Sequence, residues 1–170
     1  MDDEPATDAI DGIVDDLQEH YPDLDPSGLP IVGRVLRLAR HLEDRREVQL
    51  ASFGLTVADF DVLASLRRTA TPTAINVREL QQSLMLSSGG MTKRLDRLES
   101  SGLLERERDP NDRRGVLIGL TVAGRDLIDR ALPAVLRAER ELVDAAIGNA
   151  ERRDQTAEGL RQLLLAEEQS

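Results

Sequence analysis

The stretch from Ser87 to Thr121 decides the fold, and it reads SSGGMTKRLDRLESSGLLERERDPNDRRGVLIGLT. A basic amphipathic segment, with Ser87 or Ser88 expected to cap its start, ends at Gly102, which predicts a helix. Two strands are expected next, at 103–107 and 114–120, because turn-forming residues separate two short apolar runs. This order predicts a recognition helix followed by a β-wing.

Helical periodicity accounts for most of the remaining chain. Thr56 and Asn76 are expected to cap two shorter helices, since their side chains can accept hydrogen bonds from the first turn. Apolar residues recur at helical spacing in four further segments, 9–21, 31–51, 121–148 and 150–168. The predicted fold class is therefore mainly α with a small β-wing (α+β), a winged helix-turn-helix with long additional helices.

The predicted recognition helix has a face suited to DNA. Met91, Leu95 and Leu98 share one side and are expected to enter the core. Lys93 and Arg97 lie together on another side, from which long cationic side chains can reach base edges in the major groove. Small residues at the helix start let backbone N–H groups approach a phosphate. Taken alone, such a helix is also compatible with an ordinary solvated surface.

The predicted wing strengthens the DNA interpretation. A flexible hairpin tip with arginines beside the turn can enter the minor groove. Asp112 is expected to orient a wing arginine through a charge-assisted hydrogen bond instead of contacting DNA. The predicted contacts with double-stranded DNA are Ser87, Ser88, Gly89, Thr92, Lys93, Arg97, Arg108, Arg113 and Arg114.

Composition excludes several classes of protein. The chain has no Cys, which excludes disulfides and thiolate metal sites. It has no run of ~20 apolar residues that could span a membrane and no signal-peptide pattern, so we expect a cytoplasmic protein. The net charge is −10, yet residues 76–121 contain eight basic and seven acidic residues. The acidic excess therefore lies outside the predicted DNA reader.

Surplus apolar surface at both ends of the chain indicates an intertwined homodimer. The apolar faces of the terminal helices are larger than a small winged-helix core can bury. A monomeric helical cap is the weaker alternative to a dimer. The expected organisation has an N-terminal extension, two dimerisation segments and a DNA-binding lobe. Their bounds are 1–29 for the extension, 30–52 and 121–170 for dimerisation, and 53–120 for the lobe.

The motifs in this stretch resemble the MarR family of multiple-antibiotic-resistance regulators. The family's wing pattern, Asp-x-Arg-x-x-x-Val/Ile-x-Leu-Thr, is matched by Asp112, Arg114, Ile118, Leu120 and Thr121. The preceding pattern, Leu-x-Arg-Leu-Glu-x-x-Gly-Leu/Ile-Leu/Val, is matched by Leu95, Arg97, Leu98, Glu99, Gly102, Leu103 and Leu104. The resemblance covers about residues 31–168. It implies a homodimeric regulator that binds a palindromic operator and releases it when a small molecule binds.

A narrower resemblance concerns the urate-responsive branch of that family. It implies ligand-response roles for Asp61, Arg94 and Arg106, which match the branch positions. The branch also uses a tryptophan in the first helix, and this chain has none. Two guanidiniums suit a small anion, so we expect a polycarboxylate such as citrate or aconitate ahead of urate. The alternative is a structural salt bridge between Asp61 and Arg106.

Two other functional classes compete with a regulator. An enzyme is disfavoured, because His20 and His41 are the only histidines and no phosphate loop or nucleophile motif is present. We therefore expect no catalytic residues, no metal site and no cofactor. A winged-helix module that contacts proteins and has no ligand response is the second rival, and the arginines of the wing argue against it.

Overall fold

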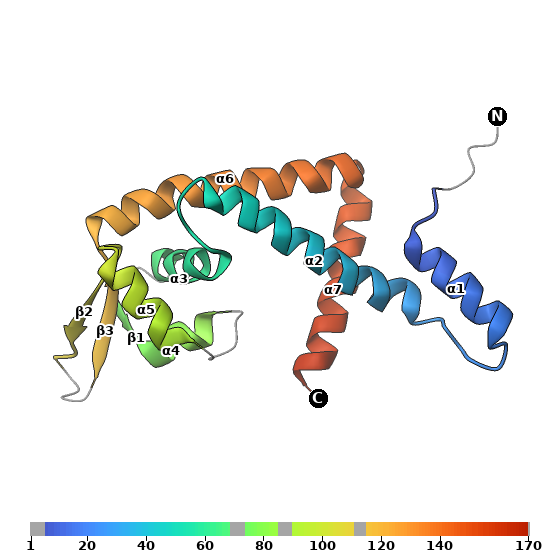
Figure 1. Cartoon of the computed structure of the whole chain (residues 1–170), viewed down its shortest axis with the longest axis horizontal. Helices are drawn as coiled ribbons and strands as arrows, with labels where there is room; N and C mark the ends of the chain where they lie inside the picture. Colours follow the sequence, from blue (N-terminus) through green and yellow to red (C-terminus); the bar gives the residue numbers. More distant parts are fainter. Residues whose placement is uncertain (1–5, 69–73, 85–89, 111–114, 170) are drawn as a thin grey trace. The chain divides into compact units, whose positions relative to one another are not determined.

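The computed structural model describes residues 6–68, 74–84, 90–110 and 115–169. The chain is mainly helical with one small antiparallel sheet (Figure 1), which confirms the predicted fold class. Its elements are, in order, α1 (Ala9–His20), α2 (Leu29–Ala51), α3 (Val57–Arg68), β1 (Ala74–Asn76), α4 (Val77–Ser83), α5 (Met91–Ser100), β2 (Leu104–Arg108), β3 (Val116–Leu120), α6 (Val122–Ala146) and α7 (Ala150–Glu168). The chain divides into two compact units between Val48 and Gln49.

In the first unit, α1 is tied to the beginning of α2 by a charged cap. Asp8 accepts the N–H of Ile10 at 2.7 Å, and Asp11 accepts the N–H of Asp8 at 2.8 Å. Arg34 donates to both carboxylates, from Nε to Asp8 at 2.8 Å and from Nη2 to Asp11 at 2.5 Å. Ile10 is buried against Gly33, where a Cβ would lie 3.1 Å from the Ile10 Cδ1 atom. The cap and this contact together fix α1 on α2.

The second unit contains the hydrophobic core. Helices α3, α4 and α5 and the sheet contribute to it, and α6 packs on α3. Thr56 and Asn76 cap α3 and α4 as predicted, since they accept the N–H groups of Asp59 at 3.2 Å and Glu79 at 2.9 Å. The largest fully buried side chains are Leu50, Leu63, Leu80, Leu98, Leu104, Ile118, Ile128, Val62 and Val135.

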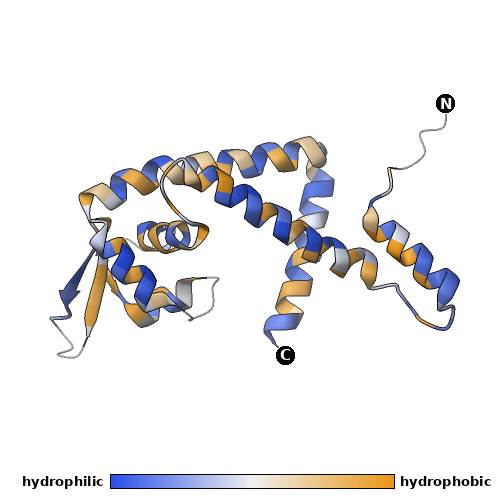
Figure 2. Ribbon diagram, viewed as in Figure 1, coloured by the Kyte–Doolittle hydropathy of each residue, from blue (hydrophilic) through white to orange (hydrophobic). Residues whose placement is uncertain are grey.

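The sheet has three strands in the order β1-β3-β2, all antiparallel. The sequence predicts only β2 and β3, and β1 is an addition that three residues are too few to reveal by periodicity. Ile118 lies opposite Ile75 of β1 and Arg106 of β2 in the register. Figure 2 shows the contrast between the wing strands, with β2 mostly hydrophilic and β3 mostly hydrophobic. The central strand is therefore the buried one.

The recognition helix α5 begins later than the sequence predicts. Its N-cap is Gly90, with φ of +84° and no capping side chain, so the predicted cap at Ser87 or Ser88 is wrong. A backbone in the left-handed region favours glycine, which explains the position of the break. Ser87 and Ser88 themselves lie outside the described residues. Gly102, with φ of +68°, ends the helix as predicted.

Candidate nucleic-acid interface

The recognition helix presents four different sides. Met91, Leu95 and Leu98 are buried in the core, which confirms the predicted apolar face. Thr92 and Lys93 are exposed, as the DNA interpretation requires. The remaining two sides carry charged residues that bond to neighbouring elements of the same unit. The helix is therefore held by apolar contacts with the core and by polar contacts on two flanks.

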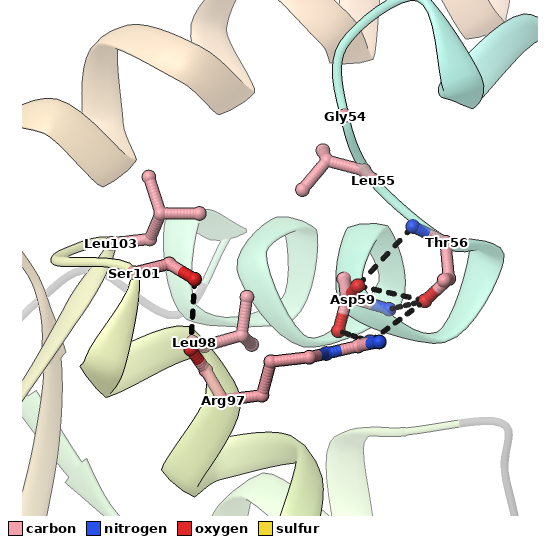
Figure 3. Close-up of a pocket in the computed structure, with 8 residues that line it drawn as sticks. All are labelled: Gly54, Leu55, Thr56, Asp59, Arg97, Leu98, Ser101 and Leu103. Carbon is pink, nitrogen blue, oxygen red and sulfur yellow. Dashed lines mark hydrogen bonds and ion pairs between the residues drawn. The ribbon is translucent and has the colours of Figure 1, made fainter.

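On the flank that faces α3, Arg97 is bonded within the protein. Its Nη2 donates to the Asp59 carboxylate and, at 3.1 Å, to the hydroxyl of Thr56 (Figure 3). The Asp59 side chain is only 6% exposed, whereas the Arg97 side chain is 53% exposed. The sequence predicts a base-reading role for Arg97, and the structure places its guanidinium on a buried carboxylate at the start of α3.

A hollow of about 210 Å³ lies beside this ion pair. Its lining combines three leucines with the ion pair and the hydroxyl of Ser101, which donates to the Arg97 carbonyl at 2.9 Å. The lining residues, drawn in Figure 3, are Gly54, Leu55, Thr56, Asp59, Arg97, Leu98, Ser101 and Leu103. The hollow leaves the exposed side of Arg97 in contact with solvent.

On the opposite flank, Arg106 of β2 joins the wing to α5. Its Nη2 lies 2.7 Å from the Asp96 carboxylate and its Nη1 lies 2.5 Å from that of Glu99. The sequence assigns this guanidinium either to a ligand or to Asp61. In the structure, Arg106 is engaged with α5, while Asp61 lies half-buried on α3.

Arg94, the third predicted ligand residue, is half-buried on α5. Among the described side chains, its Nη1 is the buried polar atom that has no hydrogen-bond partner. A buried donor without an acceptor costs about 1–3 kcal/mol. One buried guanidinium nitrogen of Arg94 is therefore left with hydrogens that it does not donate.

The wing is described up to its tip. Arg108 is exposed at the end of β2, and the Asp109 N–H donates to the Gly115 carbonyl at 3.1 Å, which closes the hairpin. The predicted contacts at the tip, Arg113 and Arg114, and the predicted orienting residue Asp112 lie outside the described residues. The same holds for Ser87, Ser88 and Gly89 at the approach to α5.

The contact between Asp59 and Arg97 is the feature that sequence reasoning missed. Thr56 is the predicted cap of α3, and in the structure its hydroxyl also donates to the Asp59 carboxylate at 2.8 Å. The arginine that completes the site lies 38 positions further along the chain. Helical spacing alone does not reveal such a pairing, because it depends on how α5 packs on α3.

Within the described residues, none of the helices is long and apolar enough to cross a membrane. No group of three or more His, Asp or Glu side chains in the described part of the chain is placed to hold a metal ion.

Comparisons with known proteins agree on one family. Residues 53–115 match the model of the MarR family. The chain is 33% identical over 134 residues to the HTH-type transcriptional regulator PecS of Dickeya dadantii (strain 3937), covering 79% of this chain and 81% of that protein. A mutant of MarR from Escherichia coli complexed with operator DNA has a TM-score of 0.69 at 27% identity, covering 87% and 97% of the two chains.

A second DNA complex has a similar fold. It is the transcriptional repressor CouR bound to a 23-mer DNA duplex, with a TM-score of 0.67 at 27% identity, covering 83% of this chain and 98% of that one. The seated recognition helix, the antiparallel wing and these relatives lead to one conclusion. The chain belongs to the MarR family of DNA-binding transcriptional regulators.

Proposed function

We propose that the protein is a homodimeric repressor that binds a pseudo-palindromic operator and releases it when a small anionic metabolite binds. The observation that carries the proposal is the exposed side of α5, where Thr92 and Lys93 project beside an antiparallel wing. A helix of ten residues fits the major groove, and the wing reaches the adjacent backbone.

Of the predicted DNA contacts within the described residues, four are exposed, namely Thr92, Lys93, Arg97 and Arg108. Arg97 also bonds to Asp59. Lys93 is suited to a base edge or a phosphate, whereas Arg108 near the wing tip is suited to the backbone. The proposed footprint also includes residues outside the described part, with Asp112 orienting a wing arginine. These further contacts are Ser87, Ser88, Gly89, Arg113 and Arg114.

The proposed dimer rests on apolar side chains that remain exposed on the long helices. Leu36 of α2 is 61% exposed and Leu164 of α7 is 53% exposed. Segments 30–52 and 121–170 would form the dimer, and 53–120 would form the lobe that binds DNA. A two-fold dimer would place its recognition helices roughly 34–36 Å apart, one helical turn of DNA.

The proposed effector is a small anion, and Arg94 supports it most directly. Its unpartnered Nη1 could donate to a carboxylate. Arg106 is engaged with Asp96 and Glu99, so a ligand that binds it competes with those carboxylates and loosens the wing from α5. Asp61 is proposed as the third ligand-response residue. Citrate or aconitate is favoured over urate, because the chain has no tryptophan to support a flat purine ring.

Selection from a library of random duplexes, followed by footprinting, tests DNA binding. The protein of residues 1–170 is expected to retain duplexes that share an inverted repeat and to protect both half-sites. A Lys93→Gln variant should lose affinity, about 1–3 kcal/mol if the contact is to a base. Retention of no duplex by the folded protein would contradict the proposal and favour a module that contacts proteins.

Titration of citrate, aconitate and urate against the protein–DNA complex tests the effector. We expect citrate or aconitate to release the duplex at millimolar concentration, and Arg94→Gln or Arg106→Ala to weaken that response. Arg108→Ala is the matched control, since it lies on the same strand as Arg106 and is exposed. An equal response in all variants, or no release by any of the three anions, would contradict the proposed effector site at Arg94 and Arg106.

A further inference from the structure

The recognition helix is held on its two flanks by ion pairs of opposite polarity. On the α3 side the helix supplies the cation, Arg97, and the scaffold supplies the carboxylate of Asp59. On the wing side the helix supplies the carboxylates of Asp96 and Glu99, and β2 supplies Arg106. Apolar contacts set the depth of α5, and these lateral ion pairs limit its rotation about its own axis.

We propose that Asp59 is a positioning residue that clamps the recognition helix through Arg97. In this assignment Arg97 holds the helix orientation, and the base-reading role falls to Lys93 and Thr92 on the exposed side. The inference rests on the proposed DNA-binding function and concerns which residues of α5 carry it.

The Asp59 carboxylate is fixed by the start of α3. Its Oδ2 accepts the hydroxyl of Thr56 at 2.8 Å and the Thr56 N–H at 3.2 Å. It also lies in the first turn of α3, where the helix dipole favours an anion. The remaining oxygen, Oδ1, faces α5 and accepts Arg97. The contacts with Thr56 therefore fix the Asp59 carboxylate independently of its contact with Arg97.

Packing alone does not hold Arg97 in this position. Its side chain is more than half exposed and borders the open hollow. Departure towards DNA would leave Oδ1 of a buried carboxylate without its cationic partner, and an uncompensated buried charge is strongly disfavoured. The Arg97 guanidinium is therefore unlike an unattached surface arginine, because its Nη2 is already bonded to Asp59 and to Thr56.

A double-mutant cycle on DNA binding separates a clamp from a base contact. The probe is a duplex selected from a random library by the wild-type protein, and the variants are Asp59→Asn, Arg97→Gln and the double variant. Asparagine can still accept the Thr56 N–H, so the cap of α3 is preserved. We expect each single variant to bind about tenfold more weakly and the double variant to lose no more than either single one, because both remove one contact.

Lys93→Gln is the matched control on the same helix. When Lys93→Gln is combined with Asp59→Asn, the two losses of DNA affinity should multiply. The double variant should then bind roughly a hundredfold more weakly if each single change lowers the affinity tenfold. The ranking of single-base operator variants should be unchanged in Arg97→Gln and altered in Lys93→Gln. Three outcomes would overturn the clamp. The first is that the affinity losses of Asp59→Asn and Arg97→Gln multiply in the double variant. The others are tighter DNA binding by Asp59→Asn and a relaxed base preference in Arg97→Gln.

Amide hydrogen exchange of the DNA-free protein gives an independent readout. Exchange in α5 should accelerate to the same extent in Asp59→Asn, Arg97→Gln and the double variant, and remain at the wild-type rate in Lys93→Gln. Exchange of Leu63 and Val62 in α3 reports whether each variant keeps its core. Unchanged α5 exchange in Arg97→Gln, a surface variant expected to fold, would overturn the clamp even if the wild type selected no duplex.

Discussion

Helices α6 and α7 follow one another in the chain, and their apolar residues have opposite environments. In α6, Ile128, Ala131 and Val135 are fully buried in the core. In α7, which is described over its whole length, no residue is buried, although four leucines lie between positions 160 and 165. The core of the second unit is thus completed within one copy, whereas α7 carries apolar surface that this copy does not cover.

The difference separates two kinds of stability. Residues 50–135 hold the core, so changes there act on folding of the single chain. Apolar residues of α7, visible as hydrophobic bands in Figure 2, should act on association with a second copy. Substitutions in the two regions can therefore be compared by whether they lower the melting temperature or the fraction of dimer.

The largest expected effect comes from removing α7. Deletion of residues 149–170 should abolish dimerisation and, with it, high-affinity operator binding, while leaving the core folded because the deleted residues contribute nothing buried. Sedimentation velocity and circular dichroism measure the two outcomes. A truncated chain that still sediments as a dimer and binds DNA normally would contradict the assignment.

Most of the scaffold follows from local patterns that the sequence displays. The caps at Thr56 and Asn76, the apolar face of α5 and the strands β2 and β3 are all predicted and observed. Each depends on residues a few positions apart, so periodicity and turn chemistry suffice.

The charged contacts of the site follow less well from sequence. Arg97 and Arg106 each have several acidic residues within reach of a long side chain, and only the packed structure selects Asp59 for one and Asp96 with Glu99 for the other. The strand β1 is missed for a different reason. Its three residues form a strand because β3 lies beside them, which is a tertiary effect.

The next largest effect is expected on the free energy of unfolding, from alanine substitutions of one glycine in α6 and one in α7. A Cβ at Gly124 of α6 would lie 1.9 Å from the carbonyl oxygen of Leu103, whose backbone must then shift. Gly124→Ala should lower the free energy of unfolding by about 1–3 kcal/mol. Gly159→Ala in α7 meets no atom within 4 Å and should stabilise the helix by roughly 0.5–1 kcal/mol.

Thermal and urea unfolding of both glycine variants measure these effects at matched protein concentration. An unchanged stability of Gly124→Ala would show that the junction of wing and α6 is looser than the structure indicates. A loss of dimer in Gly159→Ala would place that position against the second copy.

A smaller effect is expected at the wing. Arg106→Ala removes both ion pairs to α5 and should lower stability by less than about 1 kcal/mol per pair, since the partners are partly exposed. Exchange of the β2 amides should accelerate. Arg108→Ala, at the exposed end of the same strand, should leave stability unchanged and flatten the salt dependence of DNA binding. Identical behaviour of the two variants would contradict separate roles for these arginines.

The smallest effect concerns the cap that ties α1 to α2 in the first unit. The hydrogen bond from Arg34 lowers the pKa of Asp8, and the backbone hydrogen bond from Asp8, followed by Arg34, lowers the pKa of Asp11. A carboxyl whose pKa is lower in the folded state stabilises the fold above its ordinary value, 3.8 here. That stabilisation is lost as the pH falls through the lowered value.

Amide protection in α1 should therefore decrease as the pH falls below 3.8, since both carboxylate pKa values are lowered from that value, while the α6 core keeps its protection until lower pH. Arg34→Gln removes the main charged partner, so its α1 should exchange faster already at neutral pH and show a smaller further change on acidification. Because both carboxylates are solvent-exposed, 0.5 M salt should weaken the wild-type cap towards the Arg34→Gln behaviour, as expected for screened surface pairs. If α1 protection in the wild type is independent of both pH and salt, the buried contact of Ile10 with Gly33, and not the charged cap, holds the helix in place.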